Sequence, residues 1–455
     1  MNFTHHPPVP STDFTRREFL KTAALGAAAL SAGAALPPAF AARTEKRPNF
    51  LFFITDQQGL DAISACGCPD VHTPNMDRLV QRGTRFVQSH SPNPLCSPCR
   101  SSLFTGRMPS ETGVVNNGRP IRAGLPNLGE WLSQDGYDCF YAGKWHVPQA
   151  NPTKIAGFNV LPTGMGGNGH LGDACTSRNC EGYLRNRTGN KPFLLVCSLL
   201  QPHDICEWIT MHWDAPDELP YPEIASRLPA LPANFEWDRN EPKLVRQHGR
   251  PTWSDRQWRY YLWSYYRHVE MVDAELGRVL NALEDTGQAE NTVIVFTSDH
   301  GEGRGCHHMT TKNYLYEEAL KVPLVVSWPG HIGEGVTNAT HLVSGYDLMP
   351  TFSDYAGLKP PARMVGRSLR PLLEGKAVEG REFVAAQVQV TGRMIRTPDF
   401  KYITYQGDPV EQFFDMKHDP GETKNLAGNP KVAGVLDDHR KLLKEWEGRL
   451  DPAPA

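Results

Sequence analysis

The feature that most limits the fold is a set of four short apolar runs, each followed by polar residues. The runs cover residues 49–55, 192–200, 291–297 and 322–327. A continuous apolar run of this length indicates a strand that is buried on both faces of a sheet. Segments with helical spacing separate the runs, at residues 74–82, 127–134 and 255–285. This alternation predicts an α/β fold with a doubly wound, mainly parallel sheet flanked by helices.

The pattern changes towards the carboxyl end of the chain. Short antiparallel strands with Gly, Pro and Asp turns are predicted at residues 383–390, 393–396, 401–405 and 412–415. A closing helix follows, with one apolar face made of Val432, Val435, Leu436, Leu442, Leu443 and Trp446. We therefore predict a main domain over residues 42–375 and a smaller carboxyl-terminal subdomain over residues 376–455.

The first 41 residues have the pattern of an export signal. Arg16 and Arg17 precede a run of Ala, Gly and Leu, and Ala39-Phe40-Ala41 offers a small-residue cleavage site. This pattern predicts export by the twin-arginine translocase of a bacterium, to the periplasm or out of the cell. The alternative is a membrane anchor, but the run is short for a span and poor in Leu and Ile. We therefore expect no stable membrane anchor.

Composition narrows the possible functions. The 47 basic and 50 acidic residues give a net charge of −3, which argues against nucleic-acid binding through general electrostatics. Ten cysteines are too few for a disulfide scaffold in a chain of 455 residues. Cys175 and Cys180 are predicted to lie in a Gly-rich loop, where they could pair or stay free.

The segment around Cys96 carries the most informative chemistry. It reads Cys96-Ser97-Pro98-Cys99-Arg100, and proline is favoured in the first turn of a helix. A helix that begins near Pro98 places Cys96 at its amino end, where free N–H groups and the helix dipole attract an anion. Arg100 lies four residues on and could reach back towards Cys96. A redox pair and half of a zinc site are two other readings of Cys96 and Cys99.

Polar pairs follow two of the predicted strands. Asp56-Gln57 follows the first run, and Asp299-His300 follows the run that ends at residue 297. Because parallel strands end at the same edge of a sheet, both pairs should meet there. A helix cap or a turn is the alternative reading of either pair by itself.

These residues resemble the type I, formylglycine-dependent sulfatases of the alkaline phosphatase superfamily. The signature of that family is matched by Cys96, Pro98 and Arg100, with Thr105-Gly106 following; Cys99 departs from it, since serine or alanine is more usual there. The resemblance covers roughly residues 48–450 and implies that a maturation enzyme converts Cys96 to formylglycine. Further matches to the family occur at Gly143-Lys144-Trp145-His146, Pro202-His203-Asp204 and Lys312.

The resemblance also implies roles for these side chains. The implied metal ligands are Asp56, Gln57, Asp299, His300 and the formylglycine at position 96. The implied catalytic residues are Cys96, Arg100, Lys144, His146, His203 and Lys312, and the implied substrate contacts are Lys144, His203, His307 and Lys312. Lys144 and Lys312 would hold sulfate oxygens, His203 or Lys312 would protonate the leaving oxygen, and His146 would be the base for sulfate release.

The ligand types leave two candidates for the metal. Many relatives carry an oxygen-only ligand set, which suits calcium. Here Gln57 removes one negative charge and His300 offers an imidazole nitrogen, which moves the preference towards manganese. Calcium is favoured narrowly over manganese.

The predicted reaction is hydrolysis of a sulfate ester, with a sulfated carbohydrate as the expected substrate. One alternative is a phosphonate or phosphate-diester hydrolase, because some related hydrolases carry a Gln and a His at these metal positions. Another alternative is an exported protein that binds sulfated glycans without turnover. Residues 204–255 look like an insertion that supplies either rim contacts or packing groups, namely Glu207, Trp208, His212 and Trp213. Asn116 and Asn117 either line the pocket or form a turn.

Overall fold

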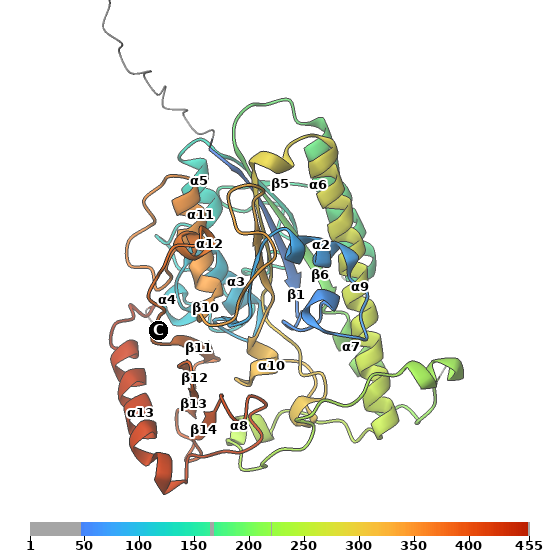
Figure 1. The fold of residues 1–455 in the computed structure, drawn as a ribbon, viewed down its shortest axis with the longest axis vertical. Helices are drawn as coiled ribbons and strands as arrows, with labels where there is room; N and C mark the ends of the chain where they lie inside the picture. Colours follow the sequence, from blue (N-terminus) through green and yellow to red (C-terminus); the bar gives the residue numbers. More distant parts are fainter. Residues whose placement is uncertain (1–46, 164–167, 220, 454–455) are drawn as a thin grey trace, which may run out of the picture. The chain divides into compact units, whose positions relative to one another are not determined.

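The structure, a computed structural model, describes residues 47–163, 168–219 and 221–453. The predicted export signal over residues 1–41 lies outside these ranges. The main element is an eight-stranded sheet in the order β5-β4-β6-β1-β7-β8-β2-β9 (Figure 1). Its strands are β1 Asn49–Asp56, β2 Thr84–Phe86, β4 Asp138–Gly143, β5 Asn159–Val160, β6 Phe193–Pro202, β7 Thr292–Ser298, β8 Leu324–Ser327 and β9 Val336–Asn338.

The sheet is mixed but mainly parallel, as the sequence predicts. The five strands β5, β4, β6, β1 and β7 are parallel to one another. Strand β8 is antiparallel to both of its neighbours, β7 and β2. The four apolar runs became β1, β6, β7 and β8, and β8 is shorter than its run. Strands β3 Ser89–His90 and β10 Val343–Ser344 form a separate, parallel two-stranded sheet.

Helices cover both faces of the sheet, as Figure 1 shows. Helices α3 Cys96–Thr105, α5 Leu128–Ser133 and α11 Leu348–Tyr355 lie on one face. Helices α6 Gly169–Asn186 and α9 Asp255–Asp285 pack together on the other face. The remaining helices are α2 Pro74–Gln81, α4 Pro109–Thr112, α7 Ile205–His212, α8 Lys243–Arg246, α10 Glu317–Leu320 and α12 Arg370–Leu373.

The core has two layers because successive residues of β1 point to opposite faces. Phe50 and Phe52 pack with α3 and α11, whereas Leu51 and Phe53 pack under α9. All four side chains are fully buried, which is the environment that the apolar run predicts.

The carboxyl-terminal part forms a separate antiparallel sheet with a closing helix. Its strands are β11 Val384–Val388, β12 Gly392–Arg396, β13 Phe400–Tyr405 and β14 Gln412–Asp415, and its helix is α13 Ala433–Glu447. Leu436, Leu443 and Trp446 are buried on this helix as expected, but Val435 is 37% exposed and Val432 precedes the helix. The apolar face is therefore narrower than predicted.

The expectation of a Gly-rich loop around Cys175 and Cys180 is wrong. Both lie within α6, and both are free thiols. Two cysteines five residues apart on a helix are too distant to form a disulfide. The helix was not predicted because its glycines and polar residues hide the apolar spacing that identifies a helix in a sequence.

No helix in the part of the chain that the structure describes is both long enough and apolar enough to cross a membrane.

Candidate active site

Four neighbouring strands of the sheet end in polar residues at one edge. Asp56 closes β1, Lys144 follows β4, His203 follows β6 and Asp299 follows β7. These strands are adjacent in the order β4-β6-β1-β7, so their carboxyl ends bring the four side chains together. Both polar pairs predicted at strand ends lie at this edge.

Tight backbone packing positions Lys144. Gly143 has a φ of +93°, and a Cβ built there would lie 1.9 Å from the carbonyl oxygen of Ser198 on β6. Only glycine fits this contact, and it directs the next residue into the edge of the sheet. The Lys144 Nζ then lies 2.7 Å from Asp56 Oδ2.

Cys96 is the first residue of α3. The helix thus begins two residues earlier than the sequence suggests, and the cysteine lies at its amino end as expected. The Cys96 Sγ lies 3.3 Å from His300 Nε2, 3.7 Å from Asp56 Oδ1 and 3.7 Å from Lys144 Nζ. The Asn117 side chain contacts this end of the helix, since its Oδ1 accepts a hydrogen bond from the Ser97 N–H at 3.0 Å.

Arg100 lies one helical turn after Cys96 and is fully buried. Its Nε donates to Asp299 Oδ2 at 2.8 Å, and its Nη2 donates to Asp56 Oδ2 at 3.0 Å. Its Nη1 donates to the Lys144 carbonyl at 2.7 Å and to Ser198 Oγ at 2.8 Å. The guanidinium therefore joins the two carboxylates, whereas the sequence suggested that it reaches back towards Cys96.

Four side chains form a buried group that can hold a metal ion. One ligand atom from each of Asp56, Cys96, Asp299 and His300 lies within 4.8 Å of the others. His300 Nδ1 lies 2.9 Å from the Gly301 carbonyl oxygen, so in the neutral imidazole the proton is on Nδ1 and the Nε2 lone pair faces the group. Two carboxylates and an imidazole fit a divalent cation well.

The two carboxylates of this group differ in pKa. Burial alone raises the pKa of Asp56, but Lys144 and His203 lower it well below its usual value. Burial and the negative charge of Asp56 raise the pKa of Asp299 to about 6. Two carboxylates that share one small site resist simultaneous ionisation, and a bound cation relieves that repulsion.

The charge at Cys96 is balanced by its neighbours. Burial and Asp56 raise the pKa of the Cys96 thiol, but the opposing effects of Lys144 and His300 are larger. The pKa of this thiol therefore lies well below its usual value. Burial by itself lowers the pKa of His300, yet Asp299 and Cys96 raise it to about 9. A group at position 96 is therefore stabilised when it carries negative charge.

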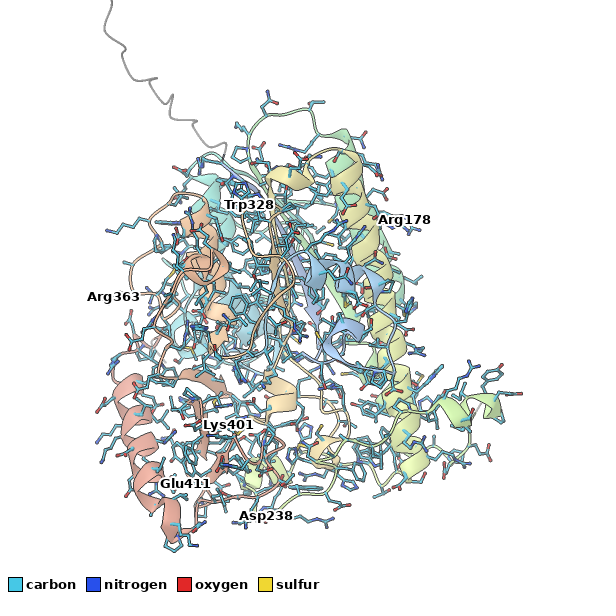
Figure 2. The ribbon with its side chains drawn as sticks, in the orientation of Figure 1. Arg178, Asp238, Trp328, Arg363, Lys401 and Glu411 are labelled. Carbon is cyan, nitrogen blue, oxygen red and sulfur yellow. The ribbon has the colours of Figure 1, made fainter. Side chains whose placement is uncertain are left out.

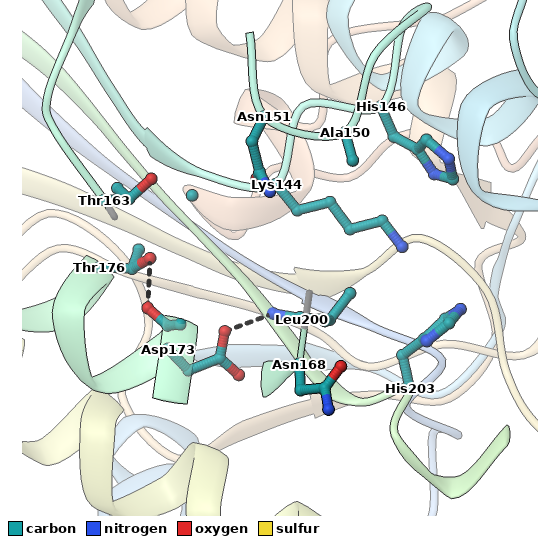
Figure 3. A pocket seen from close by; sticks show the side chains of 12 residues that line it. Lys144, His146, Ala150, Asn151, Thr163, Asn168, Asp173, Thr176, Leu200 and His203 are labelled. Carbon is teal, nitrogen blue, oxygen red and sulfur yellow. Dashed lines mark hydrogen bonds between the residues drawn. The ribbon is translucent and has the colours of Figure 1, made fainter. Parts of the chain in front are cut away.

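A pocket of about 220 Å³ opens beside this group. Lys144, His146 and His203 lie at one end, and Asp173 and Thr176 lie at the other, as Figure 3 shows. Burial, with the nearby cations Lys312 and Lys144, lowers the pKa of His203. This imidazole is therefore neutral at neutral pH. The buried Nδ1 of His146 has no hydrogen-bond partner among the described atoms, which leaves it free for a ligand.

Gln57 and Lys312 bind each other, and neither is one of the four side chains of the buried group. Lys312 Nζ donates to Gln57 Oε1 and lies 3.4 Å from Cys206 Sγ. The Gln57 amide oxygen is thus engaged by an ammonium group, and Gln57 has a left-handed backbone φ of +76°. A non-glycine residue in this conformation is uncommon and clusters at functional sites.

His307 lies away from these residues. Its Nδ1 is 2.9 Å from Glu318 Oε1, and its Nε2 is 3.3 Å from the Glu422 carbonyl oxygen. Its ring also stacks on Tyr316, with the ring centroids 4.0 Å apart. Both nitrogens are used in the protein interior, so the structure does not bring His307 to the pocket.

The tryptophans suggested as rim contacts pack against neighbouring aromatic side chains. Trp208 stacks on His212 with ring centroids 4.0 Å apart and packs edge-on against Trp253. Trp213 is 36% exposed and packs against Trp253, and Glu207 is exposed. This arrangement favours the packing interpretation for the tryptophans.

Three residues of the site were not found from the sequence. Ser198 bonds to Arg100, Cys206 lies beside Lys312, and the buried Glu302 accepts a hydrogen bond from Gln57. The sequence marks two of them weakly, by their closeness to predicted site residues. Cys206 lies three residues after His203, and Glu302 lies two residues after His300.

Comparison with known proteins identifies the family. The profile described as "Sulfatase" matches residues 48–358, and the profile "N-sulphoglucosamine sulphohydrolase, C-terminal" matches residues 305–448. The chain belongs to the sulfatase family and is a sulfuric ester hydrolase.

Individual relatives agree over most of the chain. The chain is 33% identical to a Delta 4,5-hexuronate-2-O-sulfatase of Bacteroides thetaiotaomicron, over 89% of this chain and 90% of that protein. A solved structure of a 2-O GAG sulfatase superposes with a TM-score of 0.80 at 29% identity, covering 89% of this chain and 92% of the other. The phosphonate monoester hydrolase of Agrobacterium radiobacter superposes with a TM-score of 0.76 at 26% identity, covering 89% and 96%.

Proposed function

We propose that this sulfatase releases sulfate from a carbohydrate, with formylglycine at position 96 and one divalent metal ion. The observation that carries the proposal is the buried group of Asp56, Cys96, Asp299 and His300 beside Lys144 and Arg100. The carbohydrate is proposed because relatives of the chain act on a hexuronate and on a GAG, as their names state.

The metal would be held by Asp56, Asp299 and His300 together with the oxygens of residue 96. When bound, it would neutralise charge and favour the ionised form of an oxygen nucleophile. Arg100 keeps both carboxylates aimed at one point, since it bonds to an oxygen of each. Calcium remains the first candidate because of the two carboxylates, and the His300 imidazole makes manganese the alternative. Gln57 would become a further ligand only if its oxygen left Lys312.

The remaining polar side chains can bind the sulfate group and move protons. Lys144 and Lys312 are cations that lie next to the group and would hold sulfate oxygens. His146 has a free, buried Nδ1 at the pocket and would accept a proton during sulfate release. His203 or Lys312 would protonate the leaving oxygen. The pKa of His203 is lowered, so Lys312 is the one of the two that carries a proton at neutral pH, but its own raised pKa makes it a weak acid.

Two further parts of the proposal concern maturation and export. A formylglycine-generating enzyme would oxidise Cys96, and the twin-arginine signal at residues 1–41 would direct the protein to the periplasm or out of the cell. The mature protein would then consist of a catalytic domain, residues 42–375, and a subdomain, residues 376–455.

Removing the metal and adding it back tests whether the reaction depends on the proposed metal site. The protein is co-produced with a formylglycine-generating enzyme, stripped with a chelator and assayed on an aryl sulfate with calcium or manganese added back. We expect no activity after chelation and recovery with at least one of the two metals. Activity that survives chelation would contradict the metal site.

The second candidate function is phosphonate or phosphate-diester hydrolysis, which the likeness to a phosphonate monoester hydrolase favours. Assays of an aryl phosphodiester in parallel with the aryl sulfate separate the two, and a preference for the phosphodiester of about a hundredfold (about 2.7 kcal/mol) would favour it over our proposal. Binding of a sulfated glycan without turnover by the metal-loaded, matured protein would favour a non-catalytic binder. A screen of sulfated sugars then identifies the substrate.

A further inference from the structure

Glu302 is a buried carboxylate to which the proposed reaction assigns no role. It lies in the loop after β7, two residues beyond His300, and is fully buried. Its Oε1 accepts hydrogen bonds from the Tyr261 hydroxyl and from the Thr311 N–H. Its Oε2 accepts a hydrogen bond from Gln57 Nε2. Three donors therefore converge on one carboxylate, which fixes its position.

The neighbours of Gln57 determine which way its amide points. The oxygen and nitrogen of an amide have nearly the same shape, so only hydrogen bonds distinguish them. Glu302 can only accept when ionised, and the Lys312 ammonium can only donate. The nitrogen must therefore face Glu302 and the oxygen must face Lys312, as the structure has them.

Lys312 is held in place by this arrangement. Its Nζ bonds to Gln57 Oε1 and lies 3.4 Å from Cys206 Sγ, which itself lies 3.3 Å from Gln57 Nε2. The ammonium group is thus anchored between the residues that follow β1 and β6. A long side chain loses less entropy on binding a ligand when it is already fixed.

We propose that Glu302 is a positioning residue for sulfate binding. Its carboxylate fixes the Gln57 amide, and the amide oxygen holds the Lys312 ammonium beside the reacting group. This inference rests on the proposed function in one respect, namely that Lys312 contacts the sulfate.

The same arrangement gives a reason for glutamine at position 57. A carboxylate at this position would face Glu302 at hydrogen-bond distance with no proton between them, and two such anions repel each other. The negative charge that Gln57 lacks is present at Glu302, one hydrogen bond further away. Residues 57 and 302 therefore act as a pair.

The variant Glu302→Gln tests the proposal directly. The new amide must keep its oxygen towards Tyr261 and Thr311, because both donate. Its nitrogen then faces Gln57, whose amide must turn over and present its own nitrogen to Lys312. Two donors facing each other push the ammonium group away from the site.

Binding of inorganic sulfate is the measurement, because it needs no turnover. Labelled sulfate is equilibrated by dialysis against metal-loaded protein that carries Cys96→Ala, with and without Glu302→Gln. We expect Glu302→Gln to raise the Kd by about tenfold, as expected when a hydrogen bond to a charged group is lost. An unchanged Kd in a folded variant would overturn the proposal, whatever the outcome of the hydrolysis assays.

A double variant provides the rescue. Gln57→Glu together with Glu302→Gln exchanges the acceptor and the donor, so that every group has a partner again. We expect its Kd to return to within about twofold of the parent value. Tyr314→Phe is the matched control, since it removes a buried hydroxyl that donates to the Thr311 carbonyl at 3.2 Å. This control should lower the melting temperature and leave the Kd unchanged.

The double variant also covers the case in which Glu302→Gln does not fold. In that case a Kd near the parent value in the double variant supports the pairing of positions 57 and 302. A Kd weaker by about tenfold in a folded double variant overturns the proposal.

Discussion

At the scale of single residues, Arg100 joins the two carboxylates of the site. Its guanidinium makes four hydrogen bonds, to Asp56, Asp299, Ser198 and the Lys144 carbonyl. An arginine presents its donors in a fixed, planar fork, and a lysine cannot reproduce that pattern. The position of both carboxylates thus depends on one side chain.

Arg100→Lys should therefore lower kcat/KM for an aryl sulfate by about a hundredfold, because one ammonium group cannot orient both carboxylates. Steady-state kinetics of the matured, metal-loaded protein measures the loss. Arg178→Lys is the control, since Arg178 is exposed on α6 (Figure 2). If Arg100→Lys retains activity within threefold of the wild type, the role assigned to Arg100 is incorrect.

The sequence predicted the positions of the site residues better than their contacts. Cys96 at a helix amino end and the pairs Asp56-Gln57 and Asp299-His300 at strand ends follow from local patterns, and the structure places them there. The contact between Gln57 and Glu302 joins β1 to the loop after β7, and no local pattern encodes such a contact. The same holds for His307, whose partner Glu422 lies 115 residues further along the chain.

At the scale of elements, the segment after β6 shows how side-chain packing decides between two roles. Helix α7 Ile205–His212 carries Trp208 against Trp253, Tyr260 and Tyr261. The sequence offered both packing and a substrate rim for these aromatic residues, because either role uses the same residue types. Helix α9 Asp255–Asp285 was predicted with the correct bounds from its helical spacing, and the structure shows that the Ser254 side chain caps its amino end.

Trp208→Ala should destabilise the protein by about 2–3 kcal/mol, because the substitution removes a partly buried indole from an aromatic cluster. Chemical unfolding measures the change. The KM for an aryl sulfate should stay within about twofold of the wild-type value, as expected for a packing residue. A normal unfolding free energy together with a raised KM for a sulfated sugar would show instead that Trp208 contacts the substrate.

At the scale of the whole described unit, the carboxyl-terminal sheet supports the segment that carries Lys312. Ala386, Ile403 and Phe414 of this sheet pack against Tyr314 and Tyr316. The buried Lys401, labelled in Figure 2, bonds from β13 to Glu317 at 2.9 Å and to Glu422 at 2.8 Å. The carboxyl-terminal sheet thus bears on the site through packing and through buried charge.

Lys401→Met should destabilise the protein by about 3–5 kcal/mol, because it removes the cation that Glu317 and Glu422 share and leaves Lys321 as the remaining lysine beside Glu317. Urea unfolding measures this loss. Lys441→Met on the exposed side of α13 is the control and should change stability by less than about 0.5 kcal/mol. Equal effects of the two substitutions would contradict the importance of the buried ion pairs.

Glu422 should make stability depend on pH. Burial and the nearby Glu317 raise its pKa from 4.5 to about 7, although Lys401 lowers it. The folded chain thus binds this proton more tightly than the unfolded chain, so the contribution to stability is complete below pH 4.5 and is lost as the pH rises through about 7. Glu422→Gln cannot ionise. We expect its unfolding free energy, relative to wild type, to rise between about pH 5 and about pH 8. A constant or falling difference would contradict this prediction.

The central claim is that catalysis depends on an aldehyde made from Cys96. Its most direct test is a mass spectrum of the peptide that contains residue 96, taken from preparations with different specific activities. The account predicts that the fraction of peptide in which the Cys96 sulfur is replaced by a carbonyl oxygen rises in proportion to sulfatase activity. A fully active preparation with an intact Cys96 thiol would contradict it.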